Sequence, residues 1–323
     1  NNDNNDNNDN SDNSSFIKIS EDKEFTINYS PLTINKYNME FPKLVHGLWR
    51  LNDWNFSDNQ LLSFVEELIE LGIDTIDNAD IYGGYTCESL FGNILKIKPE
   101  LRLKLKLVTK CGIKLKIDKY PERTIKTYDY SYEHIMESVE NSLRYLNTDF
   151  IDLLLLHRPS PMMNAEEVAK AFSKLSADGK VMNFGVSNFT PMQYELTQSA
   201  VDMKLITNQI EISPIHFEHF DNGNMEFFQK EKIIPMAWSP LAGGRIFNPQ
   251  TQREAETKLM MEELGSEMGT DKLDQVALDR LAALQAGVIP VMCSENNERI
   301  KSADNSIEHK MSLEPWFEKN NAY

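Results

Sequence analysis

The chain has 323 residues, of which 41% are hydrophobic and 10% aromatic, and its formal net charge is −17. This acidity argues against nucleic acid as a partner, because nucleic-acid binding favours a basic surface, and against an anionic membrane surface. The sequence has no apolar run long enough to predict a transmembrane helix, and no basic segment followed by an apolar one that would predict a signal peptide.

The three cysteines show no zinc-like spacing, and the sequence predicts no metal site. We therefore expect Cys87, Cys111 and Cys293 to be free thiols in a reducing cytoplasm. Residues 1–15 read NNDNNDNNDNSDNSS, a low-complexity stretch with nothing to bury, which predicts a disordered tail. Residues 16–323 can bury one large core and are predicted to form a single domain.

From Phe41 onward, short apolar runs alternate with amphipathic helical stretches. The predicted strands cover residues 44–49, 72–77, 105–110, 150–156, 181–187, 205–210, 233–238 and 288–293. The predicted helices cover residues 61–71, 87–95, 134–146, 165–179, a stretch that begins at Pro191, and residues 225–231, 252–264 and 273–286. This alternation predicts an α/β fold, a (β/α)8 TIM barrel with extra helices and long loops over its C-terminal mouth.

An open doubly wound sheet is the alternative fold. It needs a G-x-G-x-x-G turn after an early strand, and the glycines of YGGY at 82–85 have the wrong spacing, so the barrel is favoured. Residues 111–131 lack clear periodicity and are predicted to form a large loop over the mouth of the barrel. The aromatic residues Trp316, Phe317 and Tyr323 near the end of the sequence suggest another covering segment.

Four ionisable side chains stand at or just beyond the ends of strand-like runs. Asp77 and Tyr82 follow GIDTI, and Lys110 ends LKLVTK. His157 follows FIDLLLL. Each residue alone has a simpler explanation, as a packed aromatic, a capping or solvated charge, or a core histidine. Together, at the C-terminal ends of successive buried strands, they predict a catalytic site.

The segments ADIYGGY (79–85), LLLLHRPSP (153–161) and NQIEISP (208–214) resemble those of the aldo-keto reductase superfamily, in particular its bacterial-type branch. The resemblance extends from about Phe41 to Trp316 and implies a barrel, a nicotinamide cofactor and carbonyl reduction. It implies that Tyr82 donates a proton to the carbonyl oxygen as hydride reaches the carbon. Lys110, held by Asp77, would lower the pKa of that phenol, and His157 would orient the substrate oxygen.

The same resemblance assigns a set of residues to the cofactor. Ser187, Asn188 and Gln209 match ligands of the nicotinamide carboxamide, and Trp238 matches an aromatic that stacks on the ring. Ser294 and Arg299 match ligands of a 2′-phosphate at a helix N-terminus and favour NADP over NAD, although Cys293 and Glu295 depart from the family pattern. The remaining expected cofactor contacts are Gly47, Leu48, Trp49, Asp77, Ser239, Leu241, Gly243 and Arg245.

A mouth lined by aromatic side chains would suit an aromatic or apolar carbonyl compound. The residues expected in the substrate pocket are Trp49, Trp54, Tyr82, His157 and Arg158, with Tyr120, Tyr128 and Tyr130 in the long loop. The resulting hypothesis is a cytoplasmic, monomeric, NADP-dependent reductase of aldehydes and ketones. One alternative is an NADP-binding redox sensor or regulatory subunit with slow turnover, and a weaker one is a barrel aldolase or isomerase.

Overall fold

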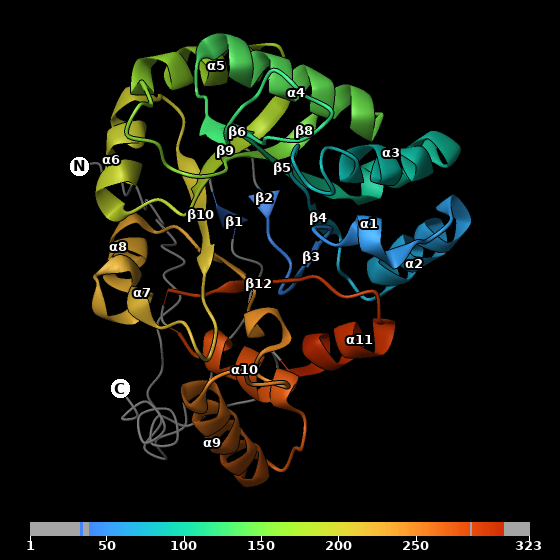
Figure 1. Cartoon of the computed structure of the whole chain (residues 1–323), viewed down its shortest axis with the longest axis vertical. Coiled ribbons are helices and arrows are strands. Elements are labelled where there is room, and N and C mark those ends of the chain that lie inside the picture. The colour runs from blue at the N-terminus through green and yellow to red at the C-terminus, as the bar shows by residue number, and fades with distance from the viewer. Residues whose placement is uncertain (1–32, 35–38, 285, 307–323) are drawn as a thin grey trace, which may run out of the picture.

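Eight parallel strands close into a barrel at the centre of the computed structural model, which describes residues 33–34, 39–284 and 286–306 (Figure 1). Their order around the barrel is β10-β11-β12-β3-β4-β5-β8-β9. The strands are β3 (Val45–Gly47), β4 (Thr75–Asp77), β5 (Lys106–Cys111), β8 (Ile151–Leu156), β9 (Val181–Ser187), β10 (Leu205–Glu211), β11 (Met236–Trp238) and β12 (Ile289–Met292). The predicted (β/α)8 barrel is confirmed, and the open sheet is wrong.

Helices surround the barrel and connect successive strands (Figure 1). The connecting helices are α2 (Asp58–Glu70), α3 (Cys87–Ile97), α4 (Tyr132–Leu146), α5 (Ala165–Ala177), α6 (Pro191–Ala200), α8 (Asn224–Glu231) and α10 (Leu273–Ala282). The helix α11 (Asn297–Ser306) follows the last strand, β12. Additional helices are α1 (Leu51–Trp54), α7 (Glu218–Asp221), α9 (Gln252–Met268) and the 3-10 segments η1 (Pro99–Lys104) and η2 (Ala242–Gly244). Within the described ranges, no helix is both long and apolar enough to cross a bilayer.

The strands are apolar on both faces because both faces are buried. In β8, Leu153 and Leu155 belong to the cluster inside the barrel, whereas Leu154 and Leu156 belong to the cluster between barrel and helices. Such continuous apolar runs are typical of parallel strands covered by helices, and they explain why FIDLLLL shows no alternation. Met39, which lies in β2 (Met39–Glu40), joins the interior cluster.

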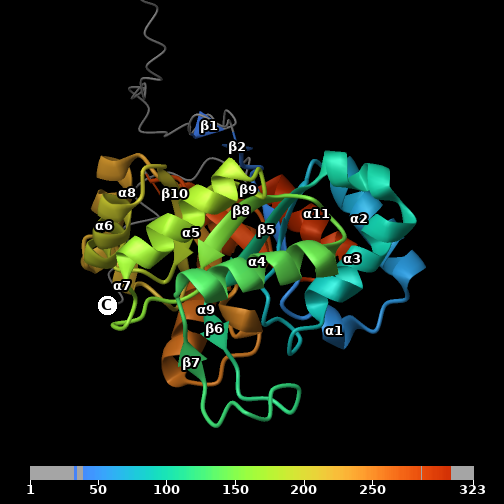
Figure 2. The ribbon, with the colours of Figure 1, turned by 90° about the horizontal axis from the view of Figure 1, so that it is seen from above.

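The two ends of the barrel carry different short ladders. At one end, β2 pairs with β1 (Thr33–Ile34), and at the other, β6 (Ile113–Lys114) pairs with β7 (Thr127–Tyr128), as Figure 2 shows. The prediction of a plain loop over 111–131 is therefore wrong in detail, because strands of two residues are too short to leave a pattern in the sequence. The predicted tail at 1–15 and the segment of Trp316, Phe317 and Tyr323 lie outside the described residues.

Candidate active site

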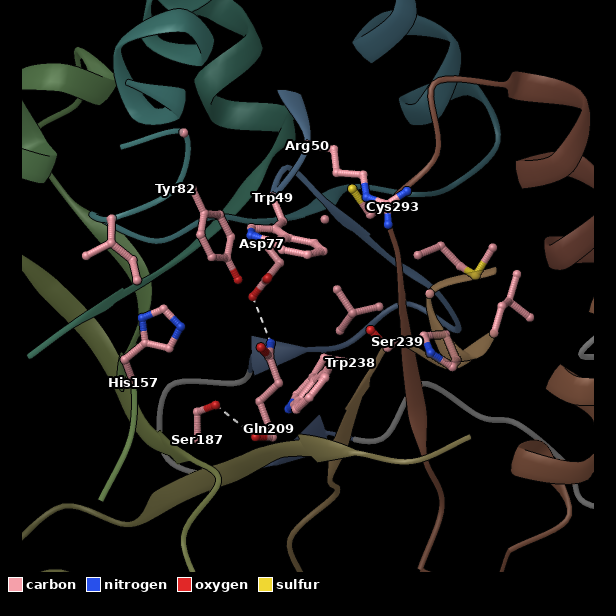
Figure 3. Close-up of a pocket in the computed structure, with 18 of the residues that line it drawn as sticks. Trp49, Arg50, Asp77, Tyr82, His157, Ser187, Gln209, Trp238, Ser239 and Cys293 are labelled. Carbon is pink, nitrogen blue, oxygen red and sulfur yellow. Dashed lines mark hydrogen bonds between the residues drawn. The ribbon is translucent and has the colours of Figure 1, made fainter. Parts of the chain in front are cut away.

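A cavity of about 680 Å³ opens at the C-terminal ends of the barrel strands. This volume is typical of small-molecule sites, and this end of a (β/α)8 barrel is where its enzymes hold their chemistry. Figure 3 shows several of its side chains converging on a common space. The expected site residues that line it are Gly47, Trp49, Asp77, Tyr82, His157, Arg158, Ser187, Asn188, Gln209, Trp238, Ser239, Leu241, Gly243, Ser294 and Arg299.

The segment after β4 brings the phenol of Tyr82 back over the barrel. The amide of Asn78 donates to the carbonyl of Val108 at 2.8 Å, which continues the pairing of β4 with β5 past the end of β4. A turn follows, closed by the amide of Tyr82 donating to the carbonyl of Ala79 at 3.1 Å. The five residues from Asp77 to Tyr82 are therefore taken up by a short continuation of β4 and the turn that follows it.

Lys110 is buried beneath the cavity floor and uses all three of its N–H donors. Its Nζ donates to Asp77 Oδ2 at 2.7 Å, to the carbonyl of Asn78 at 2.8 Å and to the hydroxyl of Tyr82 at 3.0 Å. Gln209 Nε2 donates to the other oxygen of Asp77 at 2.8 Å. Burial lowers the pKa of Lys110, whereas the charge of Asp77 acts to raise it. The ammonium is thus fixed in position and directed at the phenol oxygen.

The pKa of Tyr82 is shifted in the opposite direction from the one the sequence suggested. Burial raises the pKa of the phenol well above its ordinary value, and the negative charge of Asp77 raises it further. The expected net lowering of this pKa is therefore wrong: burial and the charge of Asp77 outweigh the effect of the Lys110 ammonium, which is itself paired with Asp77 at 2.7 Å. Tyr82 therefore keeps its proton at neutral pH.

His157 faces the same space as Tyr82, and the two ring centroids lie 5.9 Å apart (Figure 3). Its ring is buried, and Nδ1 has no hydrogen-bond partner among the described residues. Burial lowers the pKa of His157 well below its ordinary value, and the charges of Lys110, Arg158 and Lys126 lower it further. The imidazole is therefore neutral at pH 7 and has one N–H to donate.

The segment that carries His157 is clamped by Tyr130. Its hydroxyl accepts from the amide of Arg158 at 3.0 Å and donates to the carbonyl of the same residue. The ring fits only because residue 112 is glycine: a Cβ at Gly112 would lie 2.1 Å from the Tyr130 ring, and its φ is +107°. Tyr130 is thus buried behind the site instead of lining the mouth.

Three other expected pocket aromatics also lie outside the cavity lining. The Trp54 ring, at the end of α1, is partly buried and packs against the core, with its centroid 5.7 Å from that of the His46 ring. Tyr120 packs at 5.0 Å against Tyr85, and Tyr128 is exposed on β7. These placements contradict the expectation of an aromatic mouth built from the long loop.

The ends of β9, β10 and β11 form one hydrogen-bonded wall of the cavity. Ser187 Oγ donates to the carbonyl of Gln209 at 2.8 Å, and Asn188 Nδ2 donates to Ser187 Oγ at 2.8 Å. Trp238 Nε1 donates to Asn188 Oδ1 at 2.9 Å, which fixes the indole beside the cavity (Figure 3). The structure thus brings together all four residues that the resemblance assigned to the nicotinamide end.

The far end of the cavity lies at the start of α11. Ser294 Oγ accepts from the amide of Asn296, and Asn296 Oδ1 accepts from the amides of Glu298 and Arg299. Asn296 is therefore the residue that caps this helix, a role that the sequence prediction missed. The Arg299 guanidinium lies 5.8 Å from the ring of Phe247, which also lines the cavity.

Two expected cofactor residues do not line the cavity. Arg245 points away, and its guanidinium pairs with Glu254 in α9 at 2.8 Å. The side chain of Leu48 is fully buried in the core between the barrel and α2, since a leucine at this strand end gains more from packing than from exposure.

The sequence prediction did not assign several residues that line the cavity to the site. Arg50, Ile113, Leu115, Lys126 and Cys293 line the cavity, mostly from loops whose side-chain directions follow no period. Away from the cavity, three residues have potential metal-ligand atoms within 4.8 Å of one another: His216, Glu218 and His219. The sequence prediction, which considered the spacing of cysteines, did not find this group.

Comparison with known proteins places this geometry in context. A family model described as the Aldo/keto reductase family matches residues 43–317. The chain is 46% identical over 280 residues to a Bacillus subtilis (strain 168) protein named uncharacterized oxidoreductase YcsN, covering 87% of this chain and 93% of that one. It is 41% identical over 281 residues to 6-dehydroglucose reductase of Agrobacterium fabrum, covering 87% and 93%. A solved thermostable aldo-keto reductase, Tm1743, bound to the inhibitor epalrestat, superposes with a TM-score of 0.74 at 25% identity, covering 88% of this chain and 97% of that one.

Proposed function

The chain belongs to the aldo/keto reductase family, and we propose that it is an enzyme that reduces aldehydes or ketones to alcohols with NADPH. The family makes it an oxidoreductase, and the observation that carries the finer proposal is the Lys110–Asp77 pair, whose ammonium donates to the Tyr82 hydroxyl at the edge of the cavity. This arrangement holds a proton beside the space where a carbonyl oxygen would be bound.

The cavity residues fit a nicotinamide dinucleotide. The Trp238 indole offers a flat face beside the buried polar atoms of Ser187 and Gln209, and the cavity continues past Ser239 to Arg299. When bound there, the cofactor supplies a hydride. The guanidinium of Arg299 supports NADPH over NADH because it can bind a 2′-phosphate through paired N–H groups.

Tyr82 is the proposed proton donor. As the carbonyl carbon gains a hydride, its oxygen takes the proton of the Tyr82 hydroxyl, and the tyrosine later regains a proton from solvent. The raised pKa keeps this proton in place until the oxygen becomes basic. Lys110 Nζ, 3.0 Å from the phenol oxygen, then stabilises the negative charge left on the tyrosine.

Asp77 and His157 are proposed to support this transfer. Asp77 holds Lys110 in position and is itself held by Gln209. The neutral His157 ring donates its N–H to the substrate oxygen, which orients the carbonyl against Tyr82 and polarises it. General acid catalysis of this kind contributes about 10²–10⁴-fold to the rate.

The experiment that tests the proposal is turnover by purified protein with NADPH or NADH and a panel of aromatic and aliphatic aldehydes. We expect NADPH consumption matched by alcohol formation, and slower reaction with NADH. Tight NADPH binding without turnover across the panel would overturn the reductase and support a cofactor-binding sensor, which no observation here favours. A monomeric state, a cytoplasmic location and one domain over residues 16–323 stay predictions.

A further inference from the structure

The cavity is positively charged although the chain carries a net charge of −17. Four cationic side chains line it: Arg50, Lys126, Arg158 and Arg299. Among the described lining residues, the one acidic side chain is Asp77, whose charge is matched by Lys110 at 2.7 Å. A concave site of one sign within a protein of the opposite sign concentrates anions from solution.

The four cations fall into two groups. Arg50 lies on the side of Cys293, away from His157, as Figure 3 shows, and Arg299 belongs to α11, which follows Cys293 in the chain. Arg158 and Lys126 lie instead near His157, since the charges of both lower the pKa of that imidazole. The phosphates of the proposed cofactor would account for the first group, which lies toward Arg299, whereas the second group lies on the side where the substrate carbonyl would meet Tyr82 and His157.

Among the described residues, the two cations near His157 have no acidic partner that would neutralise them. The Arg158 guanidinium lies 5.7 Å from the Trp238 ring, and Lys126 Nζ lies 5.6 Å from the Tyr128 ring. Within the ranges that the structure describes, neither side chain forms an ion pair with a carboxylate. Positive charges at a cavity wall that lie beside aromatic rings, and that no described carboxylate pairs with, are suited to bind an anion from solution.

The backbone of Arg158 is fixed in advance. Both its amide and its carbonyl are hydrogen bonded to the Tyr130 hydroxyl, which is itself buried against Gly112. Preorganisation of this kind reduces the entropy lost when a ligand is bound. An arginine whose backbone position is set by a buried clamp is a better recognition residue than one on a free loop.

We propose that the substrate carries an oxyanion, a carboxylate or a phosphate, which binds between Arg158 and Lys126 while its carbonyl meets Tyr82 and His157. This inference rests on the proposed function and names its substrate class. It replaces the expectation of an apolar carbonyl compound, because the loop aromatics that suggested one lie outside the cavity lining, whereas Lys126 of the same loop lines it.

The test compares three aldehydes of similar shape: 4-formylbenzoate, 4-formylphenyl phosphate and the neutral 4-formylbenzamide. We expect kcat/KM for at least one anionic aldehyde to exceed that for the amide by about tenfold or more, as hydrogen bonds to charged groups imply. Added salt should reduce this ratio, because exposed charges are screened. The better of the two anions identifies whether carboxylate or phosphate is preferred.

Two variants locate the anion site. Arg158→Gln and Lys126→Gln should each reduce the ratio of anionic to neutral kcat/KM severalfold, and the Lys126 side chain is exposed, so its replacement leaves folding intact. The matched control is Lys116→Gln, which removes the same charge from an exposed position of the same loop outside the cavity lining and should leave the ratio unchanged.

The outcomes separate this inference from the proposed function. Turnover of the amide with a ratio near one, or a ratio unaffected by both variants, would overturn the anion site and leave the reductase standing. Absence of turnover with all three aldehydes and the wider panel would overturn the reductase, and the anion site with it.

Discussion

Within the described part of the chain, an ion pair with largely buried side chains lies near each end of β5, and the two pairs differ in what surrounds them. At the cavity end, Lys110 and Asp77 lie 2.7 Å apart with side chains 0% and 3% exposed. At the opposite end, Arg102 and Asp152 also lie 2.7 Å apart, with side chains 9% and 19% exposed. The distances are equal, so the pairs must be distinguished by their other partners.

The other hydrogen bonds of the Arg102 pair are all to residues outside the cavity lining. Its guanidinium donates to Thr148 Oγ1 and to the carbonyls of Leu105 and Phe150, and Asp152 Oδ2 also accepts the amide of Leu107. These bonds tie η1, β5 and the start of β8 together. The pair therefore stabilises the fold, as residues at this end of a barrel usually do.

The Lys110 pair, in contrast, leads to the cavity. One donor of Lys110 is directed to the Tyr82 hydroxyl, which lines the cavity together with Asp77. The same type of interaction thus stabilises the fold at one end of the barrel and holds the proposed proton donor at the other. The position of each ion pair in the barrel therefore distinguishes the pair proposed to act in catalysis from the pair that stabilises the fold.

Of the variants at the cavity end, Tyr82→Phe should reduce kcat the most. It removes the proposed proton donor but leaves the Lys110–Asp77 bond, so we expect kcat to fall about 10²–10⁴-fold while NADPH binding and thermal stability are retained. Steady-state NADPH oxidation and fluorescence titration measure these quantities. Tyr128→Phe, at an exposed tyrosine, is the control, and wild-type kcat in the Tyr82 variant would contradict the assignment.

Arg102→Met, at the opposite end of the barrel, should lower the stability of the fold without changing kcat. It removes the guanidinium that pairs with the partly buried carboxylate of Asp152 and leaves that carboxylate only the amide of Leu107, so we expect the free energy of unfolding to fall by about 2–4 kcal/mol. The kcat of the remaining folded protein should stay near that of the wild type. Urea unfolding measures the loss, and Lys98→Met, at an exposed pair with Glu66, should shift the midpoint little. Equal shifts would show that Arg102 is not the stabilising residue we describe.

Arg299→Ala tests which residue recognises the 2′-phosphate at the far end of the cavity. We expect the Kd of NADPH to rise about tenfold or more, as loss of a charged hydrogen bond implies, and that of NADH to change little. Titration of both cofactors gives the ratio. Equal weakening of both would mean that Arg299 does not contact a 2′-phosphate.

His46→Leu tests how a buried polar side chain, away from the cavity and without an ion pair among the described residues, affects stability at low pH. Both ring nitrogens of His46 lack partners among the described residues, and burial lowers its pKa from 6.5 to about 3. Below pH 6.5 the unfolded chain therefore binds a proton that the folded chain does not, so acid destabilises the fold by up to about 1.4 kcal/mol per pH unit.

The variant should remove that contribution. The stability lost by the wild type between about pH 6.5 and about pH 5 should exceed the loss in His46→Leu, as measured by urea unfolding across this range. Carboxyl groups with raised pKa values, such as Glu88 at about 7, contribute in the opposite direction, but equally to both proteins. Parallel pH profiles would contradict a neutral buried imidazole.

The sequence was sufficient to predict the barrel and the residues at its strand ends. Buried parallel strands read as continuous apolar runs, and the residues at and just beyond the C-terminal ends of these runs lie at the same end of the barrel. The convergence of Asp77, Tyr82, Lys110 and His157 follows directly from that rule.

The directions of loop side chains could not be predicted in the same way. Tyr130 turns inward because Gly112 leaves room for its ring, and Arg245 turns away because Glu254 lies in a helix nine residues later. Such choices depend on tertiary contacts that leave no period in the sequence. The same is true of the pKa of Tyr82, which depends on the degree of burial and on the pairing of Lys110.

The most direct test of this division is a comparison of Lys110→Met with Arg102→Met, in which both kcat per folded molecule and the free energy of unfolding are measured. Both variants break a buried pair, so both should lose stability. We expect Lys110→Met to lose at least about a hundredfold in kcat, whereas Arg102→Met retains it. Wild-type kcat in Lys110→Met would contradict a catalytic role for the pair at the mouth of the barrel.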